Sequence, residues 1–173
     1  MKRIIITLIL ALSIPLASAA FGADGIKLGS VDIQKVLLLS DAGKEAKEQL
    51  AGKANKYEGE KIAREEELKK LKAELERQNV VLAEDARKAK EQNFMQKRKE
   101  LDRFLKDAQE DMQAKNDELT NRIVDEVVKI IQEYSRKNGY TIVFVKNEGM
   151  IYVDEKADLT NEVLNTFNAA RKK

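Results

Sequence analysis

The stretch that decides the fold is residues 50–82, which read LAGKANKYEGEKIAREEELKKLKAELERQNVVL. Ten positions within it are spaced alternately four and three residues apart. This is the a/d repeat of a helix that lays a narrow apolar stripe against another helix. The positions are Leu50, Ala54, Tyr57, Lys61, Arg64, Leu68, Leu71, Leu75, Gln78 and Leu82. The sequence therefore predicts a coiled-coil helix here.

A second stripe of the same kind begins at Phe94. Its members are Phe94, Arg98, Leu101, Leu105, Ala108, Met112, Lys115 and Leu119. Continuing the first register past Leu82 would instead place polar residues such as Asp85 and Lys99 on the stripe, and such a seam could not hold a coiled coil. The change of phase therefore predicts an antiparallel helical hairpin with its tip at about residues 79–85. A continuous rod remains the alternative.

The tip has a candidate cap at each end. Asn79 can adopt the left-handed conformation that ends a helix, and Asp85 can cap the next helix. With the turn placed there, Leu68 is expected to face Leu101.

The arm as a whole is predicted to span residues 43–134. Gly52 and Gly59 lie on its outer surface, where each costs about 1 kcal/mol relative to Ala in a helix. Two interpretations stay open: tolerated surface glycines, or hinges that loosen the base of a flexible arm.

The segments that flank the arm, residues 24–42 and 135–173, predict a small β-body. Alternating or continuous apolar runs indicate strands, and Gly139 is the expected residue after the end of the second long helix. The predicted elements are a strand at 26–32, a short helix at 33–39, a strand at 140–145, its hairpin partner at 150–153 and a terminal helix from Asp158. Ser40 or Asp41 is expected to cap the start of the first long helix. The fold class is α+β.

So few strands could neither bury both faces nor protect their edges within one chain. The sequence therefore predicts that the body is completed by oligomerisation. The candidate contact residues are the apolar side chains of the strands: Leu28, Val31, Ile142, Phe144, Ile151 and Val153.

The first residues resemble a secretory signal peptide rather than part of the fold. Lys2 and Arg3 precede an apolar run at 4–16, and Ala17-Ser18-Ala19 supplies a cleavage pattern, so a signal peptide at about 1–19 is expected. An uncleaved anchor is the alternative. The mature chain is expected in the periplasm of a Gram-negative source, and without cysteine it holds no disulfide.

Composition argues against catalysis and against nucleic acid as a partner. The chain has no His and no Cys, which removes the commonest general base, metal ligands and thiol nucleophile. No phosphate-binding loop or nucleophile elbow is found. The precursor has 32 basic and 30 acidic residues, and the mature chain is near neutral. A polyanion binder should be clearly basic. We therefore expect a non-enzyme with no catalytic residue, cofactor or metal.

Several motifs occur in an order that resembles the Skp/OmpH family of periplasmic chaperones. They are KLGSVDIQKVL at 27–37, Asp41-Ala42-Gly43-Lys44 at the start of the arm, Glu91-Gln92-Asn93-Phe94 after the tip, Asn138-Gly139-Tyr140 before the second strand and DLTNEVL at 158–164. The resemblance covers essentially the whole mature chain.

The resemblance implies a jellyfish-like homotrimer whose helical arms surround a cavity. In that cavity the family holds unfolded outer-membrane β-barrel proteins without ATP. Better-known members are strongly basic, which suits contact with lipopolysaccharide. Because this mature chain is near neutral, we assign no residue to lipopolysaccharide.

Client contact here is expected to rest on apolar side chains. The candidates near the tip are Val80, Val81, Leu82, Phe94 and Met95; the alternative is that these residues only close the hairpin. A second class of function also remains open, an envelope coiled coil that spaces or tethers other components.

Overall fold

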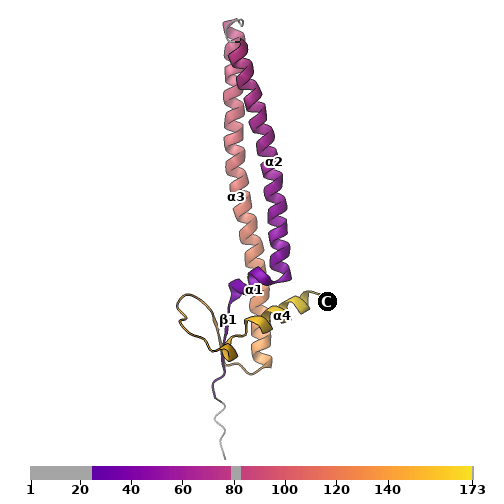
Figure 1. The fold of residues 1–173 in the computed structure, drawn as a ribbon, viewed down its shortest axis with the longest axis vertical. Coiled ribbons are helices and arrows are strands. Elements are labelled where there is room, and N and C mark those ends of the chain that lie inside the picture. Colours follow the sequence, from indigo (N-terminus) through magenta and orange to yellow (C-terminus); the bar gives the residue numbers. More distant parts are fainter. Residues whose placement is uncertain (1–24, 79–82, 173) are drawn as a thin grey trace, which may run out of the picture.

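The computed structural model describes residues 25–78 and 83–172. The elements in chain order are β1 (Leu28–Val31), α1 (Ile33–Leu39), α2 (Asp41–Gln78), α3 (Glu84–Lys137), β2 (Ile142–Val145), a 3-10 turn (Glu155–Ala157) and α4 (Thr160–Arg171). Figure 1 shows α2 and α3 side by side as a long arm, with the remaining elements gathered at its foot.

The hairpin predicted from the change of phase is confirmed, and the continuous rod is wrong. The helix α2 has 38 residues and α3 has 54, which correspond to about 57 Å and about 81 Å. Residues 79–82 of the predicted tip lie outside the described part of the chain. Asp85 was expected to cap α3, but Ala83 holds the cap position and Asp85 lies in the first turn. An acidic side chain there still suits the helix dipole.

The core lies at the foot of the arm, where β1, α1, α2, α3 and α4 meet. Its buried apolar residues are Val31, Val36, Ala42, Ala46, Leu119, Ile123, Val127, Leu159, Val163 and Phe167. The helix α3 crosses the whole body (Figure 1), so its apolar face after Leu119 packs against α1 and α4 rather than against α2 alone. An apolar face broader than a two-helix seam is typical of a helix that enters a globular core.

The body contains a two-stranded parallel sheet rather than the predicted β-hairpin. β1 pairs with β2 in the register Leu28 to Ile142 through Val31 to Val145. The expected partner strand at 150–153 is wrong, because those residues have no strand structure. The local apolar pattern could not reveal that β2 takes a partner more than a hundred residues away. The chain instead makes a turn after Lys146 and leaves the sheet, as the loop beside β1 in Figure 1 shows.

The junction between α1 and α2 depends on a close approach of two backbones. The Oγ of Ser40 accepts a hydrogen bond from the Gly43 N–H at 3.0 Å, which confirms Ser40 as the cap of the long helix. A Cβ on Gly43 would lie 1.7 Å from the carbonyl oxygen of Leu37. Only a residue without a side chain therefore fits. At the C-terminal end of α3, Gly139 has a φ of 70° and ends the helix as predicted.

We predict opposite effects for one substitution at two glycines of α2. Gly43→Ala should destabilise the protein by about 1–3 kcal/mol, because the backbone of Leu37 must move. Gly52→Ala should stabilise it by up to about 1 kcal/mol, because a Cβ there meets nothing within 4 Å and Ala favours a helix. Urea unfolding followed by circular dichroism measures both effects. Shifts of the same sign would contradict the proposed role of Gly43.

Candidate functional site

The arm is the largest part of the structure that lies outside the core. In the ranges 47–77 and 83–118 no residue is buried, and the inward-facing side chains are only half-buried. Two helices alone cannot enclose a side chain, so both flanks of their seam stay open to solvent. The arm therefore offers two long, accessible sides.

The seam follows the predicted register closely in α2 and differs more in α3. In α2, Lys53 rather than Ala54 is half-buried, and Glu60 is half-buried as well. In α3, Phe104 takes the inward position and Leu105 is 39% exposed. The inward residues of α3 shared with the prediction are Phe94, Leu101, Ala108, Met112, Lys115 and Leu119, whereas Arg98 is exposed and Lys97, Glu100 and Asp111 are half-buried.

Phe104 explains why α3 is rotated relative to the prediction. Its ring lies edge-on to Tyr57 with centroids 5.9 Å apart. The guanidinium carbon of Arg64 lies 4.6 Å from the centroid of the same ring. An aromatic contact and a cation–π contact are each worth about 0.5–1.5 kcal/mol. Together they favour Phe104 over Leu105 at the seam.

One flank of the seam carries ion pairs between the helices, and we call it the ion-pair side. Lys53 lies 2.5 Å from Asp111, and two further pairs follow toward the tip. They are Glu67–Lys97 at 3.0 Å and Glu74–Lys90 at 3.4 Å. The members on each helix are seven or fourteen residues apart, so they recur on one face of it.

Asp111 is the most connected group on this side. It accepts hydrogen bonds from the Lys53 ammonium and from the Tyr57 hydroxyl. The hydrogen bond from Lys53, followed by that from Tyr57, lowers the pKa of Asp111 below its ordinary value. The same contact with Asp111 raises the pKa of Lys53. The ionised pair therefore joins the two helices.

The opposite flank is apolar and hollowed, and we call it the groove side. A hollow of about 210 Å³ lies at mid-arm. Its lining includes Ala54 and Lys61 of α2 and Leu105, Ala108 and Met112 of α3. The pairs Ala54 with Lys61 and Leu105 with Met112 again have heptad spacing. Sequence reasoning assigned these residues to the seam, but Ala54 and Leu105 are exposed and the other three are only half-buried.

A second hollow of about 240 Å³ lies where the arm joins the body. Leu37, Leu38 and Leu50 line it together with Leu119 and other residues of α3. Leu38 is 74% exposed. The signal for this surface was present in the run Val36-Leu37-Leu38-Leu39, which is too apolar for a short helix with only one buried face.

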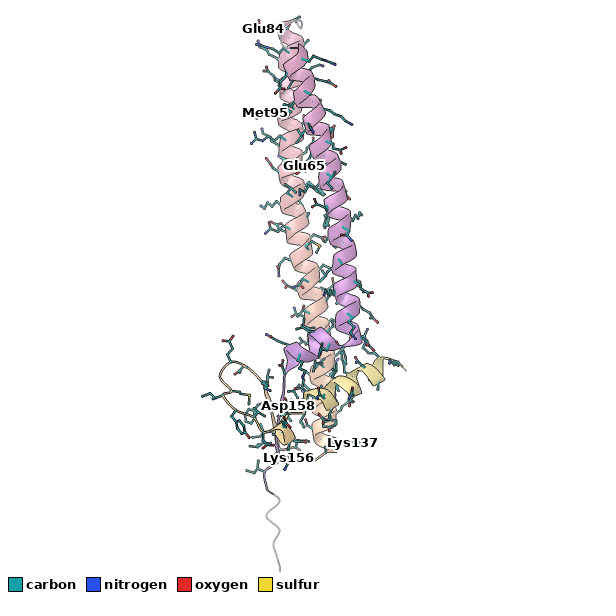
Figure 2. All side chains as sticks on the ribbon, viewed as in Figure 1. Glu65, Glu84, Met95, Lys137, Lys156 and Asp158 are labelled. Atoms are coloured by element: carbon teal, nitrogen blue, oxygen red, sulfur yellow. The ribbon has the colours of Figure 1, made fainter. Side chains whose placement is uncertain are left out.

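The predicted tip contacts are separated by the structure. Val80, Val81 and Leu82 lie outside the described residues. Phe94 is half-buried in the seam, whereas Met95 is 49% exposed. Figure 2 marks Met95 on the side of α3 away from α2. The two side chains therefore cannot form one contact surface.

The body exposes most of the apolar residues that the sequence assigned to oligomerisation. Leu28, Ile142, Phe144 and Ile151 are all more than a third exposed, and Val153 is half-buried. Val31 instead is fully buried in the chain's own core, and its strand neighbours Gly29 and Ser30 are buried as well. The prediction missed Ile26, Val145 and Tyr152, which are also exposed. The predicted hinge residues Gly52 and Gly59 lie within an unbroken helix.

Two further observations concern only the described ranges, 25–78 and 83–172. No group of three or more His, Cys, Asp or Glu side chains there could hold a metal ion. No helix there combines the length and the apolar character needed to cross a bilayer.

Comparison with known proteins gives three matches. The family described as "Outer membrane protein (OmpH-like)" matches residues 27–167. An uncharacterized protein of Aquifex aeolicus (strain VF5) is 31% identical over 154 residues, which cover 89% of this chain and 91% of the relative. A crystal structure of a protein from Caulobacter crescentus CB15, described as OmpH-like, has a TM-score of 0.78 at 16% identity, covering 83% and 84% of the two chains. The last match shows a shared fold.

We predict that the link between Lys53 and Asp111 makes the arm sensitive to acid. The pKa of Asp111 is lowered in the folded chain, so its stabilising effect is complete above the ordinary carboxyl pKa of about 3.9 and is lost as the pH falls through the folded value. Asp111→Asn should therefore be less stable than the native chain at pH 7, and the difference should shrink below about pH 4.

Urea unfolding followed by helix ellipticity between pH 7 and pH 2 measures this difference. Asp107→Asn, at an exposed position of the same helix, is the matched control. A stability difference that stays constant with pH would contradict the role assigned to the Asp111 carboxylate.

Proposed function

Because the chain belongs to the OmpH-like family of outer membrane proteins, we propose that it is a periplasmic, ATP-independent holdase chaperone. It binds unfolded outer-membrane β-barrel proteins between its helical arms and prevents their aggregation. The observation that carries this proposal is an arm with no buried side chain over its described length beyond the foot. Such an arm is accessible from both sides and is stabilised only marginally by packing.

An open arm suits a binder of unfolded chains. Clients of that kind share apolar character but no common shape, so recognition needs many weak contacts on a surface that can adjust. Sparse packing and exposed backbone also place the arm at the low-stability end of the structure, where local motion is easiest. The body, with its buried core, provides the fixed base from which the arm projects.

We propose further that the protein is a homotrimer joined through its β-body. Exposed apolar side chains at Leu28, Ile142 and Phe144 lie on a sheet of only two strands. A sheet this small needs further cover to be stable. Within the described residues the second edge of β2 has no strand partner, and an open edge of this kind is a ready site for a neighbouring chain. The number three follows from the family resemblance.

Export through a signal peptide at about residues 1–19 completes the proposal. These residues lie outside the described part of the chain, and the support for export is their sequence pattern. Sequencing the N-terminus of the protein recovered from a periplasmic extract locates the cleavage site.

The chaperone proposal predicts a trimer that keeps a client soluble without ATP. A urea-unfolded outer-membrane β-barrel protein is diluted with and without the mature chain, and light scattering gives aggregation and the mass of any complex. We expect suppressed aggregation and a complex that contains three copies of this chain. A dimer that leaves the client to precipitate would overturn the proposal and favour a tethering coiled coil.

The proposed body interface predicts that a charge on the sheet prevents assembly. Phe144→Lys places an ammonium group on an apolar side chain that is 45% exposed, so the variant should become monomeric because burying an unpaired charge is costly. Ile62→Lys on the arm, at 47% exposure, is the matched control and should leave the oligomer intact. Mass measurement with circular dichroism separates loss of assembly from loss of folding. Unchanged assembly in both variants would place the interface elsewhere.

A further inference from the structure

We propose that the groove side of the arm binds one extended, apolar strand of the client, with side chains on one face of the strand, about four residues apart, entering its two hollows. This inference rests on the proposed chaperone function and gives that function a site. It places the contact along the half of the arm near the body rather than at the tip.

The two hollows lie in one row along the hairpin. Their lining runs from Gly43 to Lys61 on α2 and from Ile123 back to Phe104 on α3. These stretches correspond to about 27 Å and about 29 Å of helix. An extended chain rises about 3.3 Å per residue, so about eight residues of a client would span the row. A transmembrane β-strand has about 9–11 residues, which is a close match in length.

The spacing of the hollows fits the side-chain alternation of a strand. Tyr57 lines the hollow at mid-arm and Lys47 lines the hollow at the foot, and ten residues of helix separate them by about 15 Å. Four residues of extended chain cover about 13 Å and return the side chain to the same face. Strands of outer-membrane barrels carry apolar residues at alternate positions, with aromatic girdles near their ends. One face of such a strand can therefore fill both hollows.

The size and charge of the hollows favour an uncharged occupant. An engineered cavity of about 150 Å³ is large enough to hold benzene, and the hollows measure about 210 and about 240 Å³. Glu58 and Lys61, both in the lining at mid-arm, form an ion pair with each other at 3.2 Å. Their charges are therefore paired with each other, and the apolar walls remain to select an aliphatic or aromatic side chain.

The arm of a second copy is the competing occupant, and the groove is too small for it. A strip about 27 Å long and about 10 Å wide, the usual distance between packed helices, offers roughly 270 Å². A stable protein interface buries about 800 Å² on each partner. A single inserted strand needs no such area when the body already holds the subunits together.

The ion-pair side is less suited to bind an apolar strand than the groove side. The ion pairs between Lys53 and Asp111, and between Glu67 and Lys97, cross from helix to helix on the ion-pair side. They fill that flank with charged side chains that already have partners. An apolar strand lying there would have to separate them from water, which is costly.

The absence of cysteine from the sequence allows a test with a single introduced label. Ala54→Cys places an environment-sensitive fluorophore in the groove, and Ala63→Cys places it about 180° around the same helix; both alanines are exposed. The mature trimer carrying either label is mixed with a urea-unfolded β-barrel protein on dilution. We expect a blue shift and protection from quenching at position 54 and little change at position 63.

A pair of variants measures the contribution of the groove to affinity. Leu105→Gln combined with Met112→Gln should weaken retention of the client by at least about tenfold, because two apolar contacts are lost. Met95→Gln, a comparable change on α3 that lies toward the tip and lines neither hollow, should leave retention unchanged. Circular dichroism of each variant checks that the arm remains helical.

The outcomes separate this inference from the proposed function. A soluble client complex with no change at position 54, or with weaker retention for Met95→Gln alone, would overturn the groove and favour the tip. A change at position 54 that depends on protein concentration without client would assign the groove to a second copy. If no client complex forms at all, the chaperone function fails and the groove inference fails with it.

Discussion

The burial of Leu119, Ile123 and Val127 in the body is the interaction on which the rest of the structure depends. These residues belong to α3, the arm helix that continues through the body. By packing against the segments that carry Val36 and Phe167, they fix the direction of the arm. The C-terminal helix reinforces the same point, because Arg171 of α4 forms ion pairs with Glu45 of α2 at 3.2 Å and with Glu126 of α3 at 2.8 Å. Figure 2 shows the side chains crowded at this foot and spread outward along the arm.

Beyond the foot, two helices must stay together without a core. The inward aromatic contact of Tyr57 with Phe104 and the ion pairs of the ion-pair side stabilise the contact between α2 and α3 in place of a packed core. Exposed ion pairs contribute little individually, but charged residues at fixed heptad positions define which register is satisfied. The arm can therefore hold its alignment while remaining weakly packed. This combination leaves part of the apolar surface on the groove side, at Ala54 and Leu105 above all, open to solvent.

The sequence predicted the hairpin because the phase of an apolar stripe is a local and additive signal. It could not distinguish Leu105 from Phe104 at the seam, since the two are neighbours and only the partners Tyr57 and Arg64 decide between them. The error at 150–153 has a similar origin. β-Propensity describes a segment that fits a pleated surface, but not which strand it pairs with. The inward position of Val31 was likewise set by contacts distant in the sequence.

The same limit explains why the groove was not found from the sequence. When an apolar stripe is interpreted as a and d positions, every apolar residue in it is assigned to the seam. Two helices in contact, however, bury only part of the surface of that stripe. Ala54, Leu105 and Met112 lie at the margin of that stripe, and their solvent-facing surface becomes visible only when the rotation of α3 is known. Apolar surface that recurs at regular spacing on one flank indicates an interaction site more strongly than the same residues scattered singly. The nearly balanced charge of the chain, with 32 basic and 30 acidic residues, agrees with this, because selection by apolar contact needs no long-range electrostatic attraction.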